Sequence, residues 1–152
     1  MKLLQSISLI LLFIASSICG ADARSNESKA NALLTIKVIG LRNHRGDLVF
    51  GVFKSADGFP TEKAKSVNWQ VKPIDADTVV FTATLPPGKY GASVLHDENQ
   101  NGKMDKGAFG VPKEGYGVTN NPKPKLRAAT FQEATFDLPA GGATHTISIQ
   151  YF

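Results

Sequence analysis

Short runs in which apolar and polar residues alternate account for much of this chain. In the run 33–39, Leu34, Ile36 and Val38 fall at every second position, and a period of two predicts a strand with one buried face. Similar runs recur along the sequence, and almost no segment has the 3.6-residue period of a helix. We expect strands at 33–39, 48–52, 69–71, 79–85, 89–97, 131–138 and 144–151.

Turn residues separate the predicted strands. Pro86-Pro87-Gly88, for example, joins two strands through a tight turn in which proline restricts φ. Short strands at regular spacing, about seven in all, predict an all-β fold, either a sandwich or a barrel, and we favour an antiparallel β-sandwich of the immunoglobulin-like kind. One stretch, from Glu98 to about Ala129, is much longer than an ordinary loop. It contains aromatic residues, which are scarce in disordered segments, so we expect one long ordered loop that packs against the sandwich.

The N-terminal residues have the pattern of a signal peptide. Lys2 precedes a mostly apolar segment at 3–18, and the small-x-small motif Ala21-Asp22-Ala23 follows it. The apolar segment is shorter than the about 20 residues of a transmembrane helix. We therefore predict a periplasmic or secreted protein that is cleaved after Ala23 and has no transmembrane segment in its mature chain. Its predicted parts are a signal peptide at 1–23, a flexible leader at 24–31 and a single β-sandwich domain at 32–152.

Cysteine content and charge restrict the function further. Cys19 allows a lipoprotein as an alternative, but Ile18 stands before it where lipid attachment favours a small residue, so we do not favour lipidation. Cleavage after Ala23 removes Cys19 and leaves no thiol for a disulfide, for catalysis or for metal binding. The net charge is +4, but the lysines are scattered and form no basic stripe. We therefore do not expect nucleic acid as a partner.

The clearest chemical motif is the segment 97–105, which has the pattern of a calcium-binding loop. Oxygen-bearing side chains stand at its first, third, fifth and ninth positions and glycine at its sixth, as in D-x-[DN]-x-[DN]-G. A hard cation takes about six to eight oxygen ligands, and alternate residues of a tightly coiled loop point inward to supply them. The predicted calcium ligands are Asp97, Asn99, Asn101 and Asp105, with the backbone carbonyl of Lys103.

Two interpretations of this segment stay open. Ala108 stands at the twelfth position, which is normally a bidentate glutamate, and Glu98 or Glu114 could substitute only if the loop folded back. With two certain carboxylates, calcium would bind weakly, with a Kd of about 0.1–1 mM. In the other interpretation, the Asn and Asp side chains form Asx-turns and no cation is involved.

The sequence contains no catalytic template, so we predict a protein that is not an enzyme. There is no G-x-S-x-G motif, and His44, His96 and His145 lack the close spacing of a zinc site. We expect a binding or structural module that uses the loop 97–121 to contact an unknown envelope protein, peptide or glycan. Phe109, Tyr116 and Trp69 could form an aromatic platform for such a ligand. The predicted binding surface comprises Phe109, Glu114, Tyr116, Asn120 and Asn121.

A further set of motifs is spread over the chain. It comprises Leu41-Arg42-Asn43, Gly46, Phe59-Pro60, Leu85-Pro86-Pro87-Gly88-Lys89-Tyr90, Val94-Leu95-His96-Asp97-Glu98-Asn99, Asn101-Gly102-Lys103-Met104-Asp105, 109–117 and Asn120-Asn121. Together these motifs resemble a family of exported bacterial proteins known as domain of unknown function family 2141. The resemblance covers about Leu33 to Tyr151 and implies a periplasmic or surface location in bacteria, with no established activity. The Pro86-Pro87-Gly88 hairpin is also similar to those of prealbumin-like and Cna-B-type sandwiches.

The first hypothesis is therefore an exported, non-catalytic module of the bacterial envelope. Two alternatives are a hydrolase acting on a periplasmic polymer, with Glu114 or Asp97 as acid or base, and a subunit of an envelope assembly. The latter would dock through an exposed edge strand.

Overall fold

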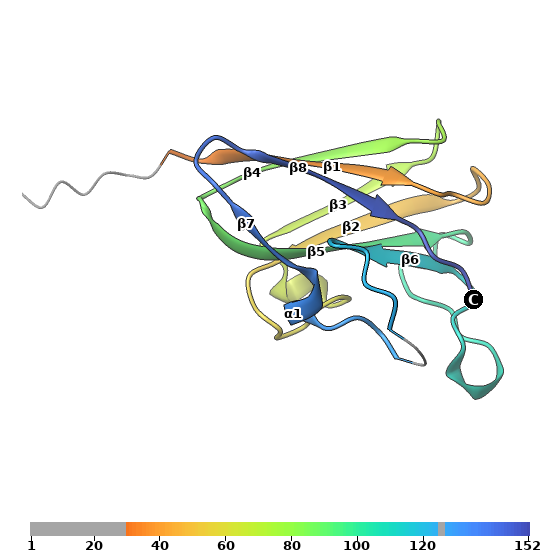
Figure 1. The fold of residues 1–152 in the computed structure, drawn as a ribbon. Helices are drawn as coiled ribbons and strands as arrows, with labels where there is room; N and C mark the ends of the chain where they lie inside the picture. Colours follow the sequence, from red (N-terminus) through yellow and green to blue (C-terminus); the bar gives the residue numbers. More distant parts are fainter. Residues whose placement is uncertain (1–29, 125–126) are drawn as a thin grey trace, which may run out of the picture.

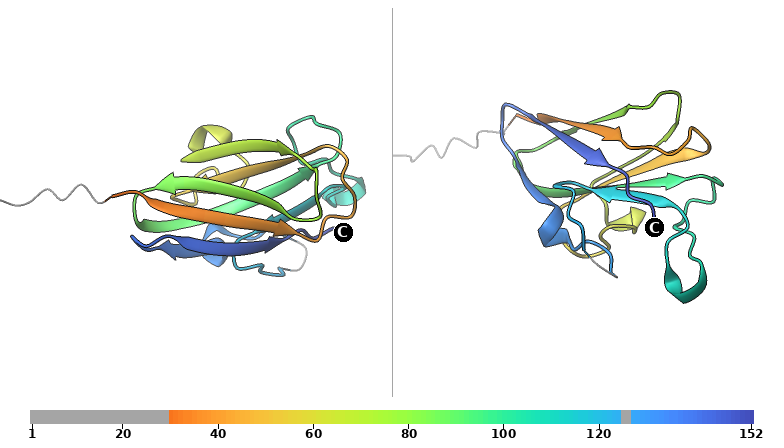
Figure 2. Two further views of the ribbon diagram at one scale, coloured as in Figure 1. Left: turned by 90° about the horizontal axis from the view of Figure 1, so that it is seen from above. Right: turned by 45° about the vertical axis from the view of Figure 1, so that its right-hand side comes forward.

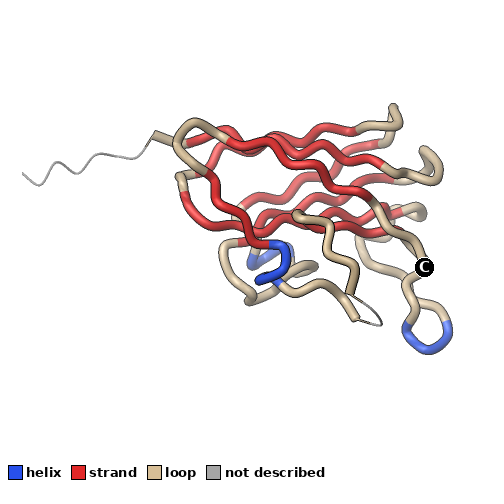
Figure 3. Tube along the Cα trace, in the orientation of Figure 1, coloured by secondary structure: helices blue, strands red, loops and turns tan. Residues whose placement is uncertain are grey.

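Two β-sheets packed face to face make up the protein (Figures 1 and 3). The computed structural model describes residues 30–124 and 127–152, so the predicted signal peptide and nearly all of the predicted leader lie outside the described residues. The strands are β1 (Ala32–Ile39), β2 (Asp47–Phe53), β3 (Asn68–Pro73), β4 (Val79–Leu85), β5 (Gly88–Asp97), β6 (Gly115–Val118), β7 (Thr135–Leu138) and β8 (Ala143–Ser148). The helical turns are η1 (Lys63–Lys65), η2 (Ala108–Gly110) and α1 (Phe131–Ala134). The predicted all-β sandwich is confirmed.

The two sheets differ in size and in the direction of their strands. The smaller one has the order β4-β1-β8, and β8 runs parallel to β1 although every other pair in the molecule's named strands is antiparallel. The larger one has the order β3-β2-β5-β6, and β7 pairs with the other end of the long strand β5. Figure 2 shows the two sheets from above and in an oblique view in which the right-hand side of Figure 1 comes forward. No helix in the described ranges is both long and apolar enough to cross a membrane.

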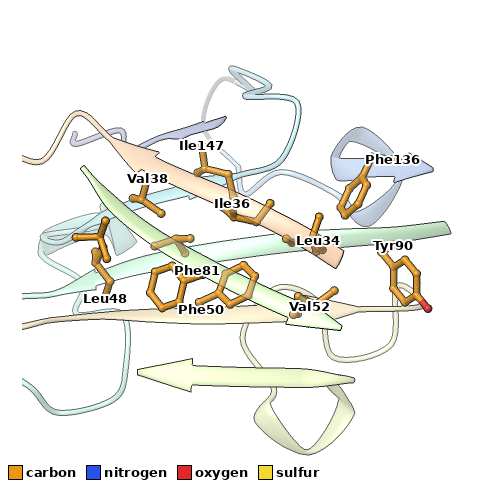
Figure 4. Packing of buried hydrophobic residues seen from close by; sticks show 14 of the residues in the cluster. Leu34, Ile36, Val38, Leu48, Phe50, Val52, Phe81, Tyr90, Phe136 and Ile147 are labelled. Carbon is orange, nitrogen blue, oxygen red and sulfur yellow. The ribbon is translucent and has the colours of Figure 1, made fainter. Parts of the chain in front are cut away.

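The core lies between the sheets and uses one face of each. Apolar side chains from β1, β2, β4, β5 and β8 meet there, and the rings of Phe50 and Phe81 stack with centroids 4.8 Å apart (Figure 4). The alternation read from the sequence explains this, because every second residue of β1 and β4 is buried. Each fully buried aliphatic or aromatic side chain contributes about 1.5–3 kcal/mol to folding.

The chain beyond β8 joins the two sheets. The backbone N–H of Ile149 donates to the carbonyl of Ile39 at 2.9 Å, and Tyr116 and Gln150 exchange two backbone hydrogen bonds of 3.0 and 2.9 Å. Glycine on β6 makes this approach possible: a Cβ atom on Gly115 would lie 2.2 Å from the ring of Tyr151, and one on Gly117 would lie 2.5 Å from Ile147.

Two segments differ from the sequence prediction. The long loop contains an additional strand, β6, so there are eight strands instead of seven. The predicted strand 131–138 begins as the helical turn α1, because Thr130 and Glu133 form a capping box and strand β7 starts only at Thr135. The predicted strand 144–151 corresponds to β8 and the bridging residues after it.

Candidate functional site

The outer face of the five-stranded sheet has a covered half. Phe53 of β2 is fully buried there, and the ring of Phe59 packs edge-on against Phe53 and Phe131 with centroid distances of 5.4 and 5.6 Å. Gly91 of β5 lies beneath this cluster, since a Cβ atom at that position would lie 3.0 Å from the Phe131 ring. Val118, Ala129 and Ala134 complete the cover. This half of the sheet face is therefore part of a second, smaller core.

The other half of the same face is open and forms a groove of about 940 Å³. The groove lies over neighbouring strands, because Val49 of β2 is paired with Leu95 of β5 and Leu95 with Tyr116 of β6. Trp69 of β3 lies across Gly51, where a Cβ atom would be 3.0 Å from the indole ring. A cavity of this size and apolar character is typical of ligand-binding sites. We call Val49, Trp69, Leu95 and Tyr116 the groove floor.

Three segments of irregular structure line the groove beside its floor. One is the loop 98–114, which contributes Met104, Phe109, Val111 and Pro112. The second contributes Pro60 and Thr61, and the third contributes Arg127 and Ala128. At one end the ring of Phe152 stacks on that of Tyr116, with centroids 5.6 Å apart and an interplanar angle of 18°.

The charge of the groove is positive. Lys103, Lys106 and Arg127 are among the residues that line it, and none of these lining residues is Asp or Glu. Arg127 is neutralised by a two-pronged pairing with Glu133, with N–O distances of 2.8 Å. Lys103 and Lys106 make no ion pair with any described residue. The groove therefore favours ligands that combine apolar or aromatic parts with hydrogen-bond acceptors or negative charge.

The loop 98–114 ends in a tight hairpin that points away from the sandwich (Figures 1 and 2). Its two arms are joined by hydrogen bonds from Gly107 N–H to the Val111 carbonyl (2.7 Å) and from Lys113 N–H to the Asp105 carbonyl (2.8 Å). At the tip, Phe109 adopts a left-handed backbone (φ 59°) and its side chain is fully exposed. The expectation that this loop would pack against the sandwich is therefore wrong for its tip, although the loop is ordered.

The predicted calcium ligands come together in one turn at the base of this loop. Both carboxylate oxygens of Asp97 accept backbone N–H groups, Oδ1 from Asn101 at 3.1 Å and Oδ2 from Gly102 at 2.6 Å. The amide nitrogens of Asn99 and Asn101 donate to Asp105 at 2.7 and 3.0 Å. The amide oxygen of Asn99 accepts from the N–H of Asn101, and that of Asn101 accepts from the N–H of Lys103. The turn is thus a succession of Asx-turns around the carboxylates of Asp97 and Asp105.

Glu114 reaches the same turn because the loop folds back. Its side chain is buried, and its carboxylate accepts the backbone N–H groups of Glu98 and Asp105, each at 3.0 Å. Within residues 30–124 and 127–152, no cluster of three or more His, Cys, Asp or Glu side chains is placed to hold a metal ion. The carboxylates of Asp97 and Glu114 are occupied with backbone groups, so their observed role is to shape the loop.

An ion-pair network fastens the base of the loop to the turn between β1 and β2. Glu98 accepts hydrogen bonds from the guanidinium of Arg42 and from the amide of Asn43. The hydrogen bond from Arg42, with a smaller contribution from Asn43, lowers the pKa of the Glu98 carboxyl from 4.5 to about 2. Arg42 also donates to the Lys113 carbonyl at 3.0 Å and lies over the ring of Tyr151. Both strands of the loop base are therefore held by one arginine.

Comparison with known proteins identifies the family. The family model described as "Uncharacterized protein conserved in bacteria (DUF2141)" matches residues 36–147. The chain belongs to this family. Searches of curated proteins and of solved structures give no match.

In this DUF2141 protein, several motifs on which the family resemblance rests meet at one end of the sandwich. Arg42-Asn43, His96, Glu98 and the segment 113–116 are far apart in the sequence but in contact through the network at the loop base. His96 is fully buried, with Nδ1 2.6 Å from the Tyr151 hydroxyl and Nε2 2.8 Å from the Arg45 carbonyl. Its two ring nitrogens are both satisfied, so His96 has a structural role.

Three residues of the predicted binding surface do not line the groove: Glu114, which shapes the base of the loop, and the two asparagines Asn120 and Asn121. The amide of Asn120 donates to the carbonyls of Glu133 (3.0 Å) and Thr135 (2.9 Å), and that of Asn121 donates to the Thr146 carbonyl (2.8 Å). Both asparagines have positive φ angles, 66° and 48°, which this residue type tolerates better than most. They connect backbone segments, whereas Phe109 and Tyr116 line the groove.

Sequence reasoning did not identify several groove residues. Val49 and Leu95 lie on the outer faces of their strands, away from the core between the sheets, and Phe152 lies beyond the last predicted strand. A detectable signal existed in the run 48–53, whose residues are apolar on both faces of one strand. Such a run indicates that both faces of the strand are covered or used.

Proposed function

We propose that the mature protein is an exported, non-catalytic binding module of the bacterial envelope, with the groove as the centre of its working surface. The observation that carries this proposal is the open half of the sheet face. Aromatic side chains of β3 and β6 line it, an ordered loop walls it, and the same face is covered by the chain elsewhere. Aromatic residues with exposed surface and few charged neighbours are typical of binding sites. The loop 97–121 contributes one wall and Tyr116 of the floor.

The expected ligand is an extended segment of a peptide or a glycan, from a partner in the envelope. The groove is open and crosses neighbouring strands, which suits a chain-like ligand better than a compact one. Lys103 and Lys106 supply donors for carbonyl, carboxylate or hydroxyl oxygens, and Trp69 and Tyr116 supply stacking surfaces. The hydrolase alternative receives no comparable support, because Asp97 and Glu114 both bind backbone N–H groups.

Calcium binding to the turn 97–105 is part of this proposal. Asp97, Asn99, Asn101 and Asp105 already converge, the Lys103 carbonyl belongs to the same turn, and Glu114 is close enough to accept the Asp105 N–H. The donor set of carboxylate and amide oxygens suits a hard cation. The amide nitrogens of Asn99 and Asn101 now face Asp105, so ion binding would require both amides to turn over. A bound ion would stiffen the base of the loop that walls the groove.

The groove is tested with the fluorescence of Trp69, the only tryptophan in the sequence. The protein is titrated with a panel of synthetic peptides and peptidoglycan fragments. We expect at least one member to change the emission saturably, and the variant Leu95→Glu in the groove floor to lose this response. Val80→Glu is the matched control, since Val80 is an exposed residue of β4 in the other sheet and does not line the groove. A panel without any response, or equal responses in both variants, would contradict the proposal.

The calcium site is tested by calorimetry on the wild type and on Asp105→Asn. We expect a Kd of about 0.1–1 mM in the wild type and no saturable heat in the variant. Asp57→Asn serves as the control, because Asp57 is an exposed acid paired with Lys65 far from the turn in sequence. Absence of heat in the wild type would leave the Asx-turn interpretation of this segment, and the groove proposal would stand unchanged.

A further inference from the structure

The geometry of the hairpin 103–113 points to a second contact, beyond ligand binding in the groove: its tip binds the surface of an anionic phospholipid membrane. The hairpin combines an exposed aromatic residue with three lysines and stands clear of the sandwich (Figure 2).

The apolar part of the proposed contact is Phe109. Its side chain is fully exposed and is carried by a left-handed backbone, an unfavourable conformation for a residue with a bulky side chain. Gly110 follows with φ 75°, and a Cβ atom there would have no neighbour within 4 Å. Val111 is also exposed. Strained residues persist where the surrounding structure enforces them, and they are concentrated at functional sites. The backbone of the hairpin therefore holds the ring of Phe109 in an exposed position.

The basic part consists of Lys103, Lys106 and Lys113, which are all exposed. The single acid of the segment is Asp105, whose carboxylate accepts the amides of Asn99 and Asn101 inside the turn. Three positive charges and one negative charge give the hairpin a net charge of +2. None of the three lysines forms an ion pair with a described residue. The charge is therefore available to an outside partner.

An exposed aromatic residue flanked by three lysines matches an anionic bilayer in two ways. Aromatic rings favour the interface between headgroups and acyl chains, and lysines close to the surface are attracted by anionic lipids. The hairpin is closed by its own backbone bonds and clamped by Glu114, so little conformational entropy is lost on binding. A flat, charged lipid surface fits an isolated protruding tip, whereas a protein partner would usually meet a broader patch.

The test uses the exported protein and sedimentation with vesicles of equal parts phosphatidylglycerol and phosphatidylcholine. Pure phosphatidylcholine vesicles are the comparison. We expect binding to the anionic vesicles that falls with added salt, and a decrease of about fivefold for each of Lys103, Lys106 and Lys113 replaced by glutamine. Phe109→Ser should reduce binding to both kinds of vesicle. All variants share the same N terminus, so any contribution from that region is equal among them.

Two controls separate this inference from the groove proposal. Leu95→Glu should keep vesicle binding while it loses ligand binding, and Lys72→Gln, on β3 and part of neither the hairpin nor the groove lining, should change neither. In a Phe109→Trp variant on a Trp69→Phe background, the emission should shift to the blue and be quenched by brominated lipids. Equal vesicle binding by the wild type and the triple lysine variant would overturn the inference. So would loss of groove-ligand binding in Phe109→Ser without any change in vesicle binding, because the ring would then serve the groove alone.

Discussion

The two halves of the outer face of the five-stranded sheet share strands β2 and β5, but the chain covers only one of them. In both halves, β2 and β5 present apolar or small residues outward. Over one half, Phe59, Phe131 and Ala129 fold back to form a second core. Over the other, the loop 98–114 is long enough to lie across the strands but rises from them as a hairpin (Figure 1). Covering the open half would bury more apolar surface, which is favourable, and its exposure is the basis of the proposed binding groove.

The largest effect on stability is expected when a central side chain of the covered half is removed. Phe53→Ala deletes a fully buried ring that contacts Phe59, and we expect the free energy of unfolding to fall by about 3–5 kcal/mol. Urea denaturation of the variant and the wild type measures this. A loss below about 1 kcal/mol would mean that the cover is not a true core and that the two halves are energetically alike.

A smaller loss is expected on the inner face of β6, behind the open half. Gly117→Ala would place a Cβ atom 2.5 Å from Ile147 and 2.8 Å from the Ser148 carbonyl. Forcing a methyl group into this contact should cost about 1–3 kcal/mol and move the residues after β8 away from β6. Hydrogen exchange at the amides of Tyr116 and Gln150 should therefore speed up. Gly141→Ala is the control, because a Cβ atom there meets nothing within 4 Å; equal behaviour of the two variants would contradict the close contact.

Acid should loosen the base of the loop that walls the open half. The folded-state pKa of Glu98, about 2, lies below its ordinary value of 4.5, so the ionised carboxylate stabilises the fold above about pH 4.5. This contribution is lost as the pH falls from about 4.5 towards 2. Because Arg42 is partly exposed, we expect only about 1–2 kcal/mol between wild type and Glu98→Gln at pH 6, vanishing near pH 2.

Unfolding curves at several pH values measure this difference. Asp57→Asn, which breaks the exposed pair with Lys65, should show almost no dependence of this kind. If the difference for Glu98→Gln were constant between pH 6 and 2, the network would not be electrostatic.

The smallest effect on stability is expected at the hairpin tip. Phe109→Ser removes a ring that contributes nothing to either core, so the free energy of unfolding should change by less than about 0.5 kcal/mol. Thermal melting provides the measurement. A larger loss would show that the ring packs against the groove wall in solution, and the contrast between the two halves would weaken.

The sequence predicted the strands of the sandwich well wherever side chains alternate. The alternation in 33–39 and 79–85 identified β1 and β4 because one face is buried and the other exposed. It failed for β6, where Gly115 and Gly117 occupy the inward positions and remove the apolar signal. The requirement for glycine there comes from chain far away in sequence, at Ile147 and Tyr151. Only the three-dimensional contact explains it.

The candidate site was predicted in part. Trp69, Tyr116 and Phe109 were singled out as aromatic residues near a long loop, and the turn 97–105 was found from its spacing alone. Whether a side chain such as Asn120 faces a ligand or the backbone depends on carbonyls supplied by other strands, here those of Glu133 and Thr135. The start of α1 could have been predicted from the sequence, since Thr130 and Glu133 have the spacing of a capping box.

The parallel pairing of β1 with β8 determines when the smaller sheet can form during synthesis. The smaller sheet needs β8 to cover one edge of β1, so a chain that emerges N-terminus first presents that edge unpaired until β8 has also emerged. Pairings between segments so distant in sequence form slowly and leave strand edges exposed meanwhile. A protein with this topology stays incomplete during synthesis. The smaller sheet is therefore expected to form only once nearly all of the described chain has left the ribosome.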